Sequence, residues 1–471
     1  MAAADPIEAA DPIGAADPIE AEELSIAILA AGRGTRMRND RPKVLHEVAG
    51  RSLIAHVVGL ALSLRPVRLV TVLGAGMEEV AAEVRKLAPE GQIVIQDPPQ
   101  GTGHALAVAA PALPEHGTVL VLYGDTPLLT RTTLVRLLER RAGDGAAVTV
   151  LGMRPPDPQG YGRLRADPDG RLHAIVEHEH CDADLLARDL CNAGVMALAA
   201  DRLRPLLAEL PRQAASGEHY LTDAVGLAVA KGWPCSAIEG DWIEGQGVNT
   251  QAQLALVAGF FQTRRRAELM AKGVIMEAPE TVMLSADTAI GPGAVIEPFV
   301  VFRPGVTVEP GAVIHAHSYL EQALIGAGAE VGPFARLRPG AEIGARGKIG
   351  NFVEVKNARL GTGAKASHLT YLGDCEVGAG ANIGAGTVTC NYDGFMKHRT
   401  VIGEAAFVGS NTALVAPVEI GERVVVGAGS VVTADVPADA LVLSRVPQRT
   451  LAGAGARLRA RLGLEKMRRK S

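Results

Sequence analysis

A glycine-rich turn close to the start of the chain carries the residues best suited to chemistry. Residues 24–29 form a short apolar run with the length and β-branched content of a buried strand, and Gly32 and Gly34 follow it. Glycines remove the side chains that would keep an anion away from backbone N–H groups. The basic residues that follow are Arg33, Arg36 and Lys43. A strand, a glycine turn, a helix start and fixed positive charge are together typical of a polyphosphate-binding site.

The spacing of this turn separates it from two better-known phosphate motifs. It lacks the Gly-Lys-Ser/Thr of a P-loop and the three glycines of the dinucleotide fingerprint. The whole string from Leu29 to Met37, with Arg41-Pro42-Lys43 after it, resembles the signature of nucleoside-diphosphate-sugar pyrophosphorylases. These enzymes move a nucleotidyl group from a nucleoside triphosphate onto a sugar 1-phosphate. The resemblance implies the same reaction class for this part of the chain.

Apolar runs and helical patterns alternate over the first half of the chain. We expect strands at 67–73, 92–96 and 118–123, and helices at 77–87 and 103–110. Such alternation predicts a mostly parallel α/β sheet of Rossmann-like type, covered by helices, with ligands at the carboxyl ends of its strands.

A different rhythm starts after Lys272, where apolar residues recur every six positions. Small residues often stand two places earlier, as at Ala294 and Ala312, and glycine often follows. A period of six does not fit a helix and is typical of a left-handed parallel β-helix of hexapeptide repeats. The recurring residues begin with Ile290, Ile296, Phe302, Val308 and Ile314 and end with Ile420, Val426 and Val432.

The six-residue register slips at 320–325, 355–372 and 389–402. We interpret a slip as residues that loop out of the coil, and loops on a rigid repeat scaffold are where binding chemistry is expected. The last two slips contain His368 and the segment from Cys390 to Lys397.

These patterns predict five segments. Residues 1–23 repeat Ala-Asp-Pro-Ile three times, with seven acids and no base, which favours a disordered arm. A nucleotidyltransferase domain at 24–249, a helical linker at 250–271 and a hexapeptide β-helix at 272–450 follow. The tail at 451–471 is rich in arginine and lysine and is expected to form a frayed helix.

Bulk properties exclude several classes of function. The chain of 471 residues has a formal net charge of −5, which favours neither nucleic acid nor an anionic membrane as a partner. We find neither an apolar run of membrane-spanning length nor a secretory signal. The five cysteines are odd in number and have no Cys-x-x-Cys spacing, so we expect reduced thiols and a cytoplasmic location.

Four longer strings make the resemblance more specific. They resemble the bifunctional bacterial N-acetylglucosamine-1-phosphate uridyltransferase and glucosamine-1-phosphate N-acetyltransferase, over residues 24 to 450. They are Gly332-Pro-Phe-Ala-Arg-Leu-Arg-Pro-Gly340, Gly350-Asn-Phe-Val-Glu-Val-Lys356, His368-Leu-Thr-Tyr-Leu-Gly-Asp374 and Asn382-Ile-Gly-Ala-Gly-Thr-Val-Thr-Cys-Asn-Tyr-Asp-Gly394.

For the uridyltransferase the resemblance implies a site that binds UTP, N-acetylglucosamine 1-phosphate and Mg²⁺. Asp125 and Asn249 would hold the metal, and Arg36 and Lys43 would stabilise the transferring phosphate. Gln96 and Gly101-Thr102 would contact uracil. The other implied residues are Leu29, Ala30, Gly32, Gly34, Tyr123 and Gly124 for the nucleotide, and Gly162, Glu177 and Asn192 for the sugar phosphate.

For the acetyltransferase the resemblance implies His368 as the general base that frees the amine of glucosamine 1-phosphate. Glu354 would orient His368 or hold the substrate ammonium, and Arg338 and Lys356 would bind the sugar phosphate. Tyr371 and Asn382 would contact the sugar. The implied acetyl-CoA residues are Ala385, Asn391, Tyr392, Ser410, Ala428 and Arg445, with Lys397 close by.

Related hexapeptide acyltransferases are trimers, and the resemblance implies a homotrimer here. The segment 391–397 is longer than a normal turn, so we expect it to reach a neighbouring prism and wall its acetyl-CoA pocket.

Two alternative functions remain open at this point. The chain could be a uridyltransferase whose β-helix only assembles or regulates it, or a non-catalytic assembly subunit. A chain whose β-helix only assembles or regulates it should have lost the motifs around His368 and Arg338, and a non-catalytic subunit should have lost Lys43 or Asp125. All of these residues are present. The cluster His178-Glu179-His180-Cys181 could suggest a metal site, but residues on one strand alternate faces, so we expect a solvent-exposed segment.

Overall fold

The computed structural model describes residues 23–214 and 217–469, which form two compact units. One unit ends at Arg265 and the other begins at Arg266, so the division falls within helix α8 (Gln251–Ala271). The acidic arm predicted at 1–23 lies outside the described residues except for Glu23.

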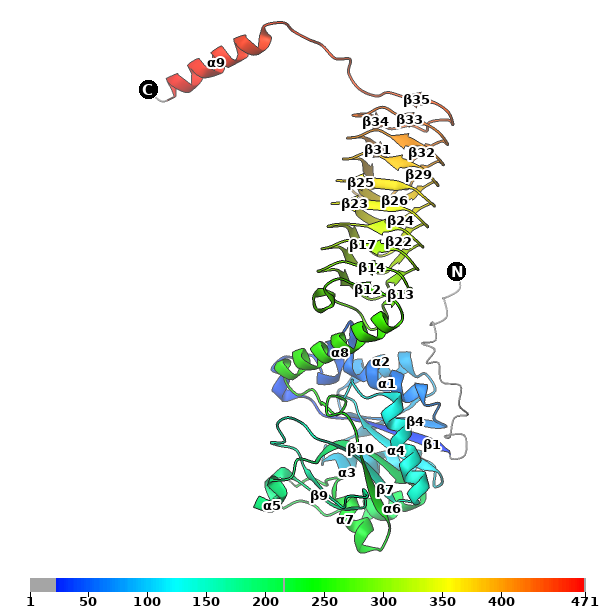
Figure 1. Cartoon of the computed structure of the whole chain (residues 1–471), viewed down its shortest axis with the longest axis vertical. Helices are drawn as coiled ribbons and strands as arrows, with labels where there is room; N and C mark the ends of the chain where they lie inside the picture. The colour runs from blue at the N-terminus through cyan, green and yellow to red at the C-terminus, as the bar shows by residue number, and fades with distance from the viewer. Residues whose placement is uncertain (1–22, 215–216, 470–471) are drawn as a thin grey trace. The chain divides into compact units, whose positions relative to one another are not determined.

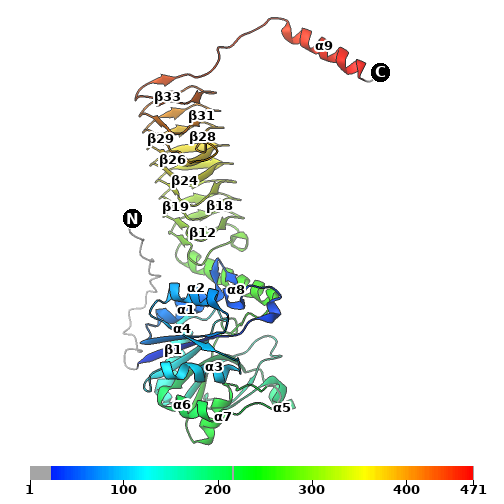
Figure 2. The same ribbon diagram turned by 180° about the vertical axis from the view of Figure 1, so that it is seen from behind.

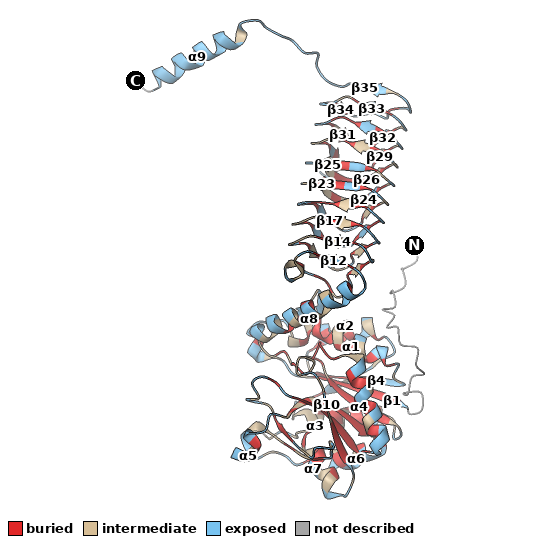
Figure 3. Ribbon diagram, viewed as in Figure 1, coloured by how far each residue is buried: buried red, intermediate tan, exposed pale blue. Residues whose placement is uncertain are grey.

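The first unit is an α/β sheet with helices on both faces (Figure 1). Buried residues fill its central strands, as the red colouring shows in Figure 3. In spatial order the sheet contains β11 (Cys235–Glu239), β7 (Val148–Met153), β10 (Cys191–Ala199), β6 (Thr118–Tyr123), β1 (Leu24–Ala30), β4 (Arg68–Gly74) and β5 (Gln92–Gln96). The hairpin of β8 (Arg163–Ala166) and β9 (Leu172–Val176) pairs with β10, and β2 (Glu47–Val48) pairs with β3 (Arg51–Ser52).

Two apolar cores hold the helices against this sheet. One core joins residues of α1 (Leu53–Ser63), α2 (Glu78–Leu87) and α4 (Arg131–Asp144). The other joins α3 (Thr102–Ala109), α6 (Ala200–Ala208) and α7 (Asp223–Ala230) to the opposite face. Short helix α5 (Ala183–Leu186) follows the β8–β9 hairpin. The Rossmann-like fold is confirmed.

The path from β11 to β5 is mostly parallel, as expected, but one of its central strands runs in the opposite direction. β1 pairs in parallel with β4 and β6, as expected, but β10 runs antiparallel to both β6 and β7. The sheet is therefore mixed, and its parallel strands β6, β1, β4 and β5 bring their carboxyl ends to one edge.

The second unit is the predicted left-handed parallel β-helix, whose stacked coils Figures 1 and 2 show from opposite sides. One face is a ten-stranded sheet of β12 (Ile275–Met276), β14 (Val295–Ile296), β17 (Val313–Ile314), β20 (Glu330–Val331), β23 (Lys348–Asn351), β25 (Lys365–His368), β27 (Asn382–Ile383), β30 (Phe407–Val408), β33 (Val425–Val426) and β35 (Leu441–Val442).

The other two faces belong to one fourteen-stranded sheet, because β24 (Glu354–Leu360) and β26 (Tyr371–Val377) each continue around a corner. Its further strands are β13 (Ala289–Ile290), β15 (Val301–Phe302), β16 (Thr307–Val308), β18 (Tyr319–Leu320), β19 (Ala323–Ile325), β21 (Arg336–Leu337), β22 (Ala341–Ile343), β28 (Val388–Cys390), β29 (Thr400–Ile402), β31 (Ala413–Val415), β32 (Val418–Ile420) and β34 (Val431–Val432).

The recurring apolar residues fill the interior of this prism. Ile296, Val308 and Ile314 are almost fully buried, and so are the small residues Ala294 and Ala312 that precede two of them. Small and branched side chains alternate at inward positions and form one continuous core along the stack.

Two of the three register slips are not loops, which corrects the sequence-based interpretation. Ile296 pairs with Ile314, eighteen residues on, whereas Ile314 pairs with Val331 and Ile349 with Ala366, each seventeen residues on. These coils are one residue shorter at one corner, where Asn357, for example, has a left-handed conformation with a φ of 44°. Only the slip at 389–402 is an insertion, since Asn382 pairs with Phe407, twenty-five residues on.

The basic tail forms the expected helix, α9 (Ala454–Arg468), whose residues are almost all exposed. No helix among the described residues is both long enough and apolar enough to cross a membrane.

Candidate active sites

The glycine-rich turn leaves β1 at the edge where the parallel strands end. We expected a helix to begin here, but the glycine-rich turn leads into a three-residue 3-10 turn, Thr35–Met37. Arg38 ends this turn and has a left-handed conformation. Gly34 has a φ of 70°, and a Cβ there would lie 2.3 Å from Cβ of Lys43. The glycine therefore gives Lys43 room to pass the turn and reach the sheet edge.

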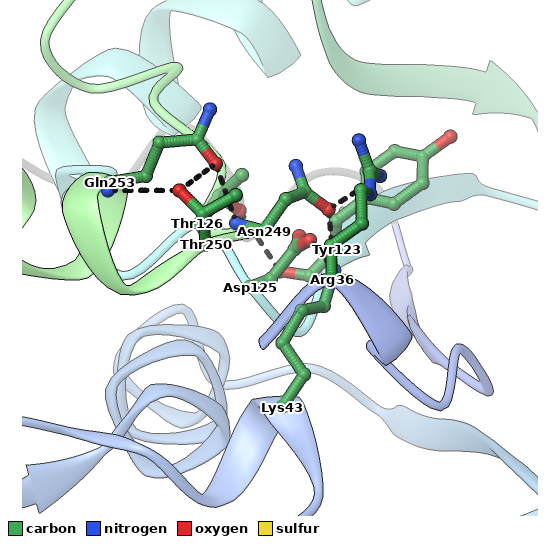
Figure 4. A network of polar contacts seen from close by, with 8 residues as sticks. All are labelled: Arg36, Lys43, Tyr123, Asp125, Thr126, Asn249, Thr250 and Gln253. Carbon is green, nitrogen blue, oxygen red and sulfur yellow. Dashed lines mark hydrogen bonds and ion pairs between the residues drawn. The ribbon is translucent and has the colours of Figure 1, made fainter. Parts of the chain in front are cut away.

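Lys43 meets two oxygens from distant segments (Figure 4). Its Nζ lies 2.5 Å from Oδ2 of Asp125 and 3.1 Å from Oδ1 of Asn249. Arg36 donates to the same Asn249 oxygen at 3.0 Å. The lysine and aspartate side chains are mostly buried, with 12% and 18% of their surface exposed. Two of the predicted cations and both predicted metal ligands thus form one network.

Asp125 and Asn249 are held in place through their own backbone. The N–H of Val248 donates to the carbonyl of Asp125 at 3.0 Å, which ties the two segments together. The N–H of Asn249 donates to Oε1 of Gln253 at 2.9 Å, and the N–H of Gln253 donates to Oγ1 of Thr250. This reciprocal cap fixes the start of α8 and the position of Asn249 (Figure 4).

A cavity of about 560 Å³ opens beside this network. Most residues predicted for the nucleotide and the sugar line it, although they come from five separate stretches of the chain. The predicted residues in its wall are Leu29, Ala30, Gly32, Lys43, Gln96, Gly101, Thr102, Tyr123, Asp125, Glu177 and Asn192. The predicted residues outside its lining are Gly34, Arg36, Gly124, Gly162 and Asn249.

The residues expected at uracil line the cavity together with Tyr123, which was expected at the nucleotide. Gln96 is buried, and its Nε2 donates to the carbonyl of Gly101 at 3.0 Å. Thr102 accepts from the N–H of Leu221 at 3.1 Å. Burial raises the pKa of Tyr123 to about 12, so its phenol is neutral and can donate a hydrogen bond.

The residues expected at the sugar lie around Glu177. Its Oε1 accepts from Oγ1 of Thr222 at 2.7 Å. A Cβ on Gly162 would come within 3.3 Å of its Oε2, so the glycine leaves room for the carboxylate. Asn192 pairs through its backbone with Gly162 at 2.8 Å. Gly124 is packed closely in the same way, because a Cβ there would lie 2.8 Å from the Cβ of Ala30.

Sequence reasoning missed one whole wall of the cavity. Glu218, Tyr220 and Thr222 line it from the segment that precedes α7. No spacing rule links this segment to the glycine-rich turn. The only available signal was an acid, an aromatic and a hydroxyl residue close together before an apolar helix.

His178 was expected in a solvent-exposed strand, and the assumption of a strand was wrong. His178–His180 form a 3-10 turn rather than a strand, so alternation of faces does not apply. Glu179 and His180 are exposed, as expected, but His178 and Glu179 both line the cavity. The Nδ1 of His178 is buried without a hydrogen-bond partner among the described residues. No group of three or more His, Cys, Asp or Glu within that described part of the chain could hold a metal ion.

On the β-helix, His368 lies at the end of β25 and not in a loop. The shorter coil pairs it with Asn351 of the strand below, and the Oδ1 of Asn351 lies 2.6 Å from its Nδ1. His368 is exposed. With the Asn351 amide assigned so that its carbonyl oxygen faces the ring, the hydrogen lies on Nδ1 and Nε2 is left as the basic nitrogen.

Glu354 bonds to arginine rather than to His368 in this chain. Its Oε1 accepts from Arg338 at 2.8 Å, and its Oε2 lies 3.8 Å from Arg336. The structure places Asn351, rather than Glu354, at the Nδ1 of His368.

The remaining polar residues gather around the insertion at 391–398. The pKa of Lys356 is lowered, chiefly by its contact with Lys397 and then by burial, which shows two ammonium groups close together. Asn391 is buried at the base of the insertion, and Tyr392 is exposed and pairs with Lys397. Two adjacent cations suit a phosphate ligand.

The residues expected at acetyl-CoA form a column on successive coils. A Cβ on Gly384 would meet the N–H of Ser410, and one on Gly409 would meet that of Ala428. Ala385 follows the first glycine and accepts from the N–H of Asn411 at 2.7 Å. Arg445 donates to the carbonyl of Ala428 at 2.6 Å. The predicted sugar residues Tyr371 and Asn382 begin β26 and β27 on neighbouring faces.

Comparison with known proteins agrees with this two-part architecture. Residues 26–225 match the MobA-like NTP transferase domain, and residues 287–322 and 399–434 match the six-repeat bacterial transferase hexapeptide. The crystal structure of a UDP-glucose pyrophosphorylase complexed with UDP-glucose is similar over 51% of this chain and 99% of its own, at 17% identity and a TM-score of 0.43.

Relatives match almost the whole chain. The bifunctional protein GlmU of Bradyrhizobium sp. (strain ORS 278) is 49% identical over 433 residues, which is 92% of this chain and 96% of that protein. GlmU of Azorhizobium caulinodans is 50% identical over 445 residues, 94% of this chain and 99% of its own. The resemblance found in the four sequence strings is confirmed. The chain belongs to the GlmU family of bifunctional uridyltransferase and acetyltransferase enzymes.

Proposed function

We propose that the first unit transfers a uridyl group from UTP to N-acetylglucosamine 1-phosphate, and that the β-helix makes this acceptor by acetylating glucosamine 1-phosphate. The observation that carries the first half is the convergence of Lys43, Asp125 and Asn249 beside the cavity. The one that carries the second half is the contact between His368 and Asn351.

Asp125 and Asn249 fit a magnesium ion as its protein ligands. Both are hard oxygen donors, and their oxygens already face one cation, the ammonium of Lys43. Two such ligands suit Mg²⁺, which completes its octahedron with phosphate oxygens and water. When bound, the ion would neutralise charge on the triphosphate.

The transfer itself needs no protein nucleophile. A phosphate oxygen of the sugar phosphate attacks the α-phosphorus of UTP in line, the bond to the bridging oxygen breaks, and pyrophosphate leaves. Lys43 and Arg36 supply the positive charge that stabilises the negative charge developing on the phosphate. The backbone at Leu29, Ala30, Gly32 and Gly34, with Gly124 behind it, lets the nucleotide approach the sheet edge.

Different residues of the cavity wall would bind the base and the sugar. We assign Gln96, Gly101, Thr102 and Tyr123 to the uridine. Glu177 and Asn192 would hydrogen-bond the sugar hydroxyls and the acetamido group, with Gly162 leaving space for Glu177. A sugar analogue that cannot hydrogen-bond to this carboxylate and this amide would leave them unpaired, so it should bind poorly.

Acetyl transfer on the β-helix would use His368 as its general base. Nε2 takes a proton from the substrate amine while the amine nitrogen attacks the thioester carbonyl. The C–S bond then breaks, and coenzyme A leaves as the thiol. Asn351 keeps the hydrogen on Nδ1 and so keeps Nε2 basic.

The substrates of this step would lie on either side of His368. We assign Arg338, Lys356 and Lys397 to the sugar phosphate, and Tyr371, Asn382 and Glu354 to the sugar and its amine. Asn391, Tyr392, Ala385, Ser410, Ala428 and Arg445 would bind acetyl-CoA.

We also propose a homotrimer located in the cytoplasm. A column of exposed rings supports the first proposal: Phe299, His317, Phe334 and Phe352 stack at 4.8–5.4 Å between ring centres along one corner. Exposed apolar columns of this kind mark contact surfaces. Five free cysteines support a reducing compartment. Sedimentation of the full chain tests the trimer, and a monomer with full acetyltransferase activity would contradict it.

One assay tests the proposed function. The full chain is incubated with glucosamine 1-phosphate, acetyl-CoA, UTP and Mg²⁺, and both coenzyme A thiol and pyrophosphate are measured. We expect both products, with pyrophosphate dependent on acetyl-CoA. Release of pyrophosphate from glucosamine 1-phosphate without acetyl-CoA would contradict the proposed order.

A further inference from the structure

Asp374 is a polar residue of the β-helix that the roles above do not use. It stands at a corner of its coil in a left-handed conformation, with a φ of 49°, and it is half-buried. Its Oδ1 accepts from Nδ2 of Asn357 at 2.6 Å, and its Oδ2 accepts from Nδ2 of Asn391. Each partner is seventeen residues away along the chain, so the three residues lie on successive coils.

The surroundings of Asp374 favour its charged form. Burial works against the charge, but the two asparagine hydrogen bonds and the nearby charges of Lys356 and Lys397 outweigh it and lower the pKa of Asp374. One carboxylate is therefore hydrogen-bonded to a proposed acetyl-CoA residue and lies close enough to both proposed phosphate-binding lysines to feel their charge.

Asn391 is also the base of the hairpin at 391–398. Its carbonyl accepts from the N–H of His398 at 2.9 Å, and Tyr392 pairs with Lys397 just above. At the tip, Phe395 is 94% exposed. Asn391 is 8% exposed, so it is the member of this hairpin that is built into the prism. Its side chain is held by Asp374.

We propose that Asp374 is a positioning residue of the acetyltransferase site, which anchors Asn391 and thereby the hairpin that carries Tyr392 and Lys397. The inference rests on the proposed acetyltransferase function. Asp374 touches no substrate in this account and acts through Asn391. Its loss should therefore weaken binding of acetyl-CoA more than it slows the chemical step.

The replacement Asp374→Asn separates this role from a general effect on folding. Asparagine tolerates the left-handed conformation, so the corner is kept. The introduced amide has one acceptor oxygen for two incoming donors, so Asn357 or Asn391 must turn its side-chain amide over and loses its present hydrogen bond. We expect the KM for acetyl-CoA to rise about tenfold or more, with a smaller change in kcat. Uridyl transfer by the same protein should stay unchanged.

A reciprocal variant should restore the anchor. Asn391→Asp alone brings two carboxylates together and should also raise the KM for acetyl-CoA. In the double variant Asp374→Asn/Asn391→Asp, the amide at position 374 accepts from Asn357 and donates to the new carboxylate, so every group is paired again. Asn357→Gly is the matched control, since it removes the other partner of Asp374 without touching the hairpin.

Proteolysis provides a readout that does not depend on activity. Chymotryptic cleavage after Phe395 should be faster in Asp374→Asn than in the parent and should slow again in the double variant. An unchanged KM and cleavage rate in Asp374→Asn would overturn the proposal, and so would a double variant that recovers neither. If the parent transfers no acetyl group, the proposed function fails, while the cleavage rates still test the anchor.

Discussion

Lys43 and Asp125, 82 residues apart along the chain, meet at 2.5 Å between Nζ and Oδ2 at the carboxyl edge of the parallel strands. Each side chain is mostly buried, so the pair is shielded from solvent. In such a setting a fixed charge acts on a bound phosphate more strongly than it would in water. The ammonium of Lys43 therefore contacts both predicted metal ligands, and Lys43 also lines the cavity.

Replacement of Lys43 by methionine should lower uridyl transfer about a hundred- to a thousandfold, because a charge aimed at the transferring phosphate is lost. Pyrophosphate release measures this, and coenzyme A release from the same protein should be unaffected. Lys86→Met is the matched control, since Lys86 is an exposed lysine of α2 outside the network. Equal losses in the two variants would contradict the assignment.

Thr222→Val should raise the KM for N-acetylglucosamine 1-phosphate about tenfold, because Glu177 then loses the hydroxyl that orients it. The KM for UTP should not change. Thr222→Ser keeps the hydroxyl and should restore the parent value. A valine variant with a raised KM for UTP instead would show that Thr222 supports nucleotide binding.

The first unit should lose stability as the pH falls below neutrality. Burial lowers the pKa of His56 from 6.5 to about 4, so the unfolded chain takes up the proton first. The stabilisation is complete above pH 6.5 and is lost as the pH falls towards 4. Between about pH 7.5 and about pH 5 we expect a loss of about 2 kcal/mol in the free energy of unfolding from this residue.

Tryptophan fluorescence during urea unfolding measures this loss, because both tryptophans, Trp233 and Trp242, lie in the first unit. His56→Gln removes the titrating group and should reduce the pH dependence by the same amount. An equal pH dependence in the parent and the variant would show that His56 does not carry it.

The thiols should divide into two classes. Cys191, Cys235 and Cys375 are buried, and burial raises the pKa of Cys235 to about 11 and that of Cys375 to about 12. Because the thiolate is the reactive form, an aromatic disulfide reagent should label only Cys181 and Cys390 in the native protein. Peptide mapping identifies the labelled positions, and rapid labelling of Cys375 would indicate that the β-helix opens.

Local periodicity explains what could be predicted from the sequence. The apolar run of β1 and its glycines form a local pattern, and each repeat of the β-helix needs only its own six residues to define the inward position. The antiparallel direction of β10 could not be predicted, because it depends on the path of the chain between β7 and β10.

Partners at the sites were harder to predict than the sites themselves. Asn351 reaches His368 because a coil is shortened by one residue, and the sequence showed only that the register slips there. Thr222 reaches Glu177 from a segment 45 residues away along the chain, and no short motif joins the two. Such contacts follow from packing of whole elements rather than from spacing.

Mixing two singly inactive proteins tests the central claim, which is that two independent sites act in sequence. Asp125→Asn should stop uridyl transfer and His368→Ala should stop acetyl transfer, so neither protein alone should convert glucosamine 1-phosphate, acetyl-CoA and UTP into the sugar nucleotide. Together they should form it, because the acetylated sugar phosphate made by the first is the acceptor for the second. No sugar nucleotide from the mixture, with both proteins folded, would contradict the account.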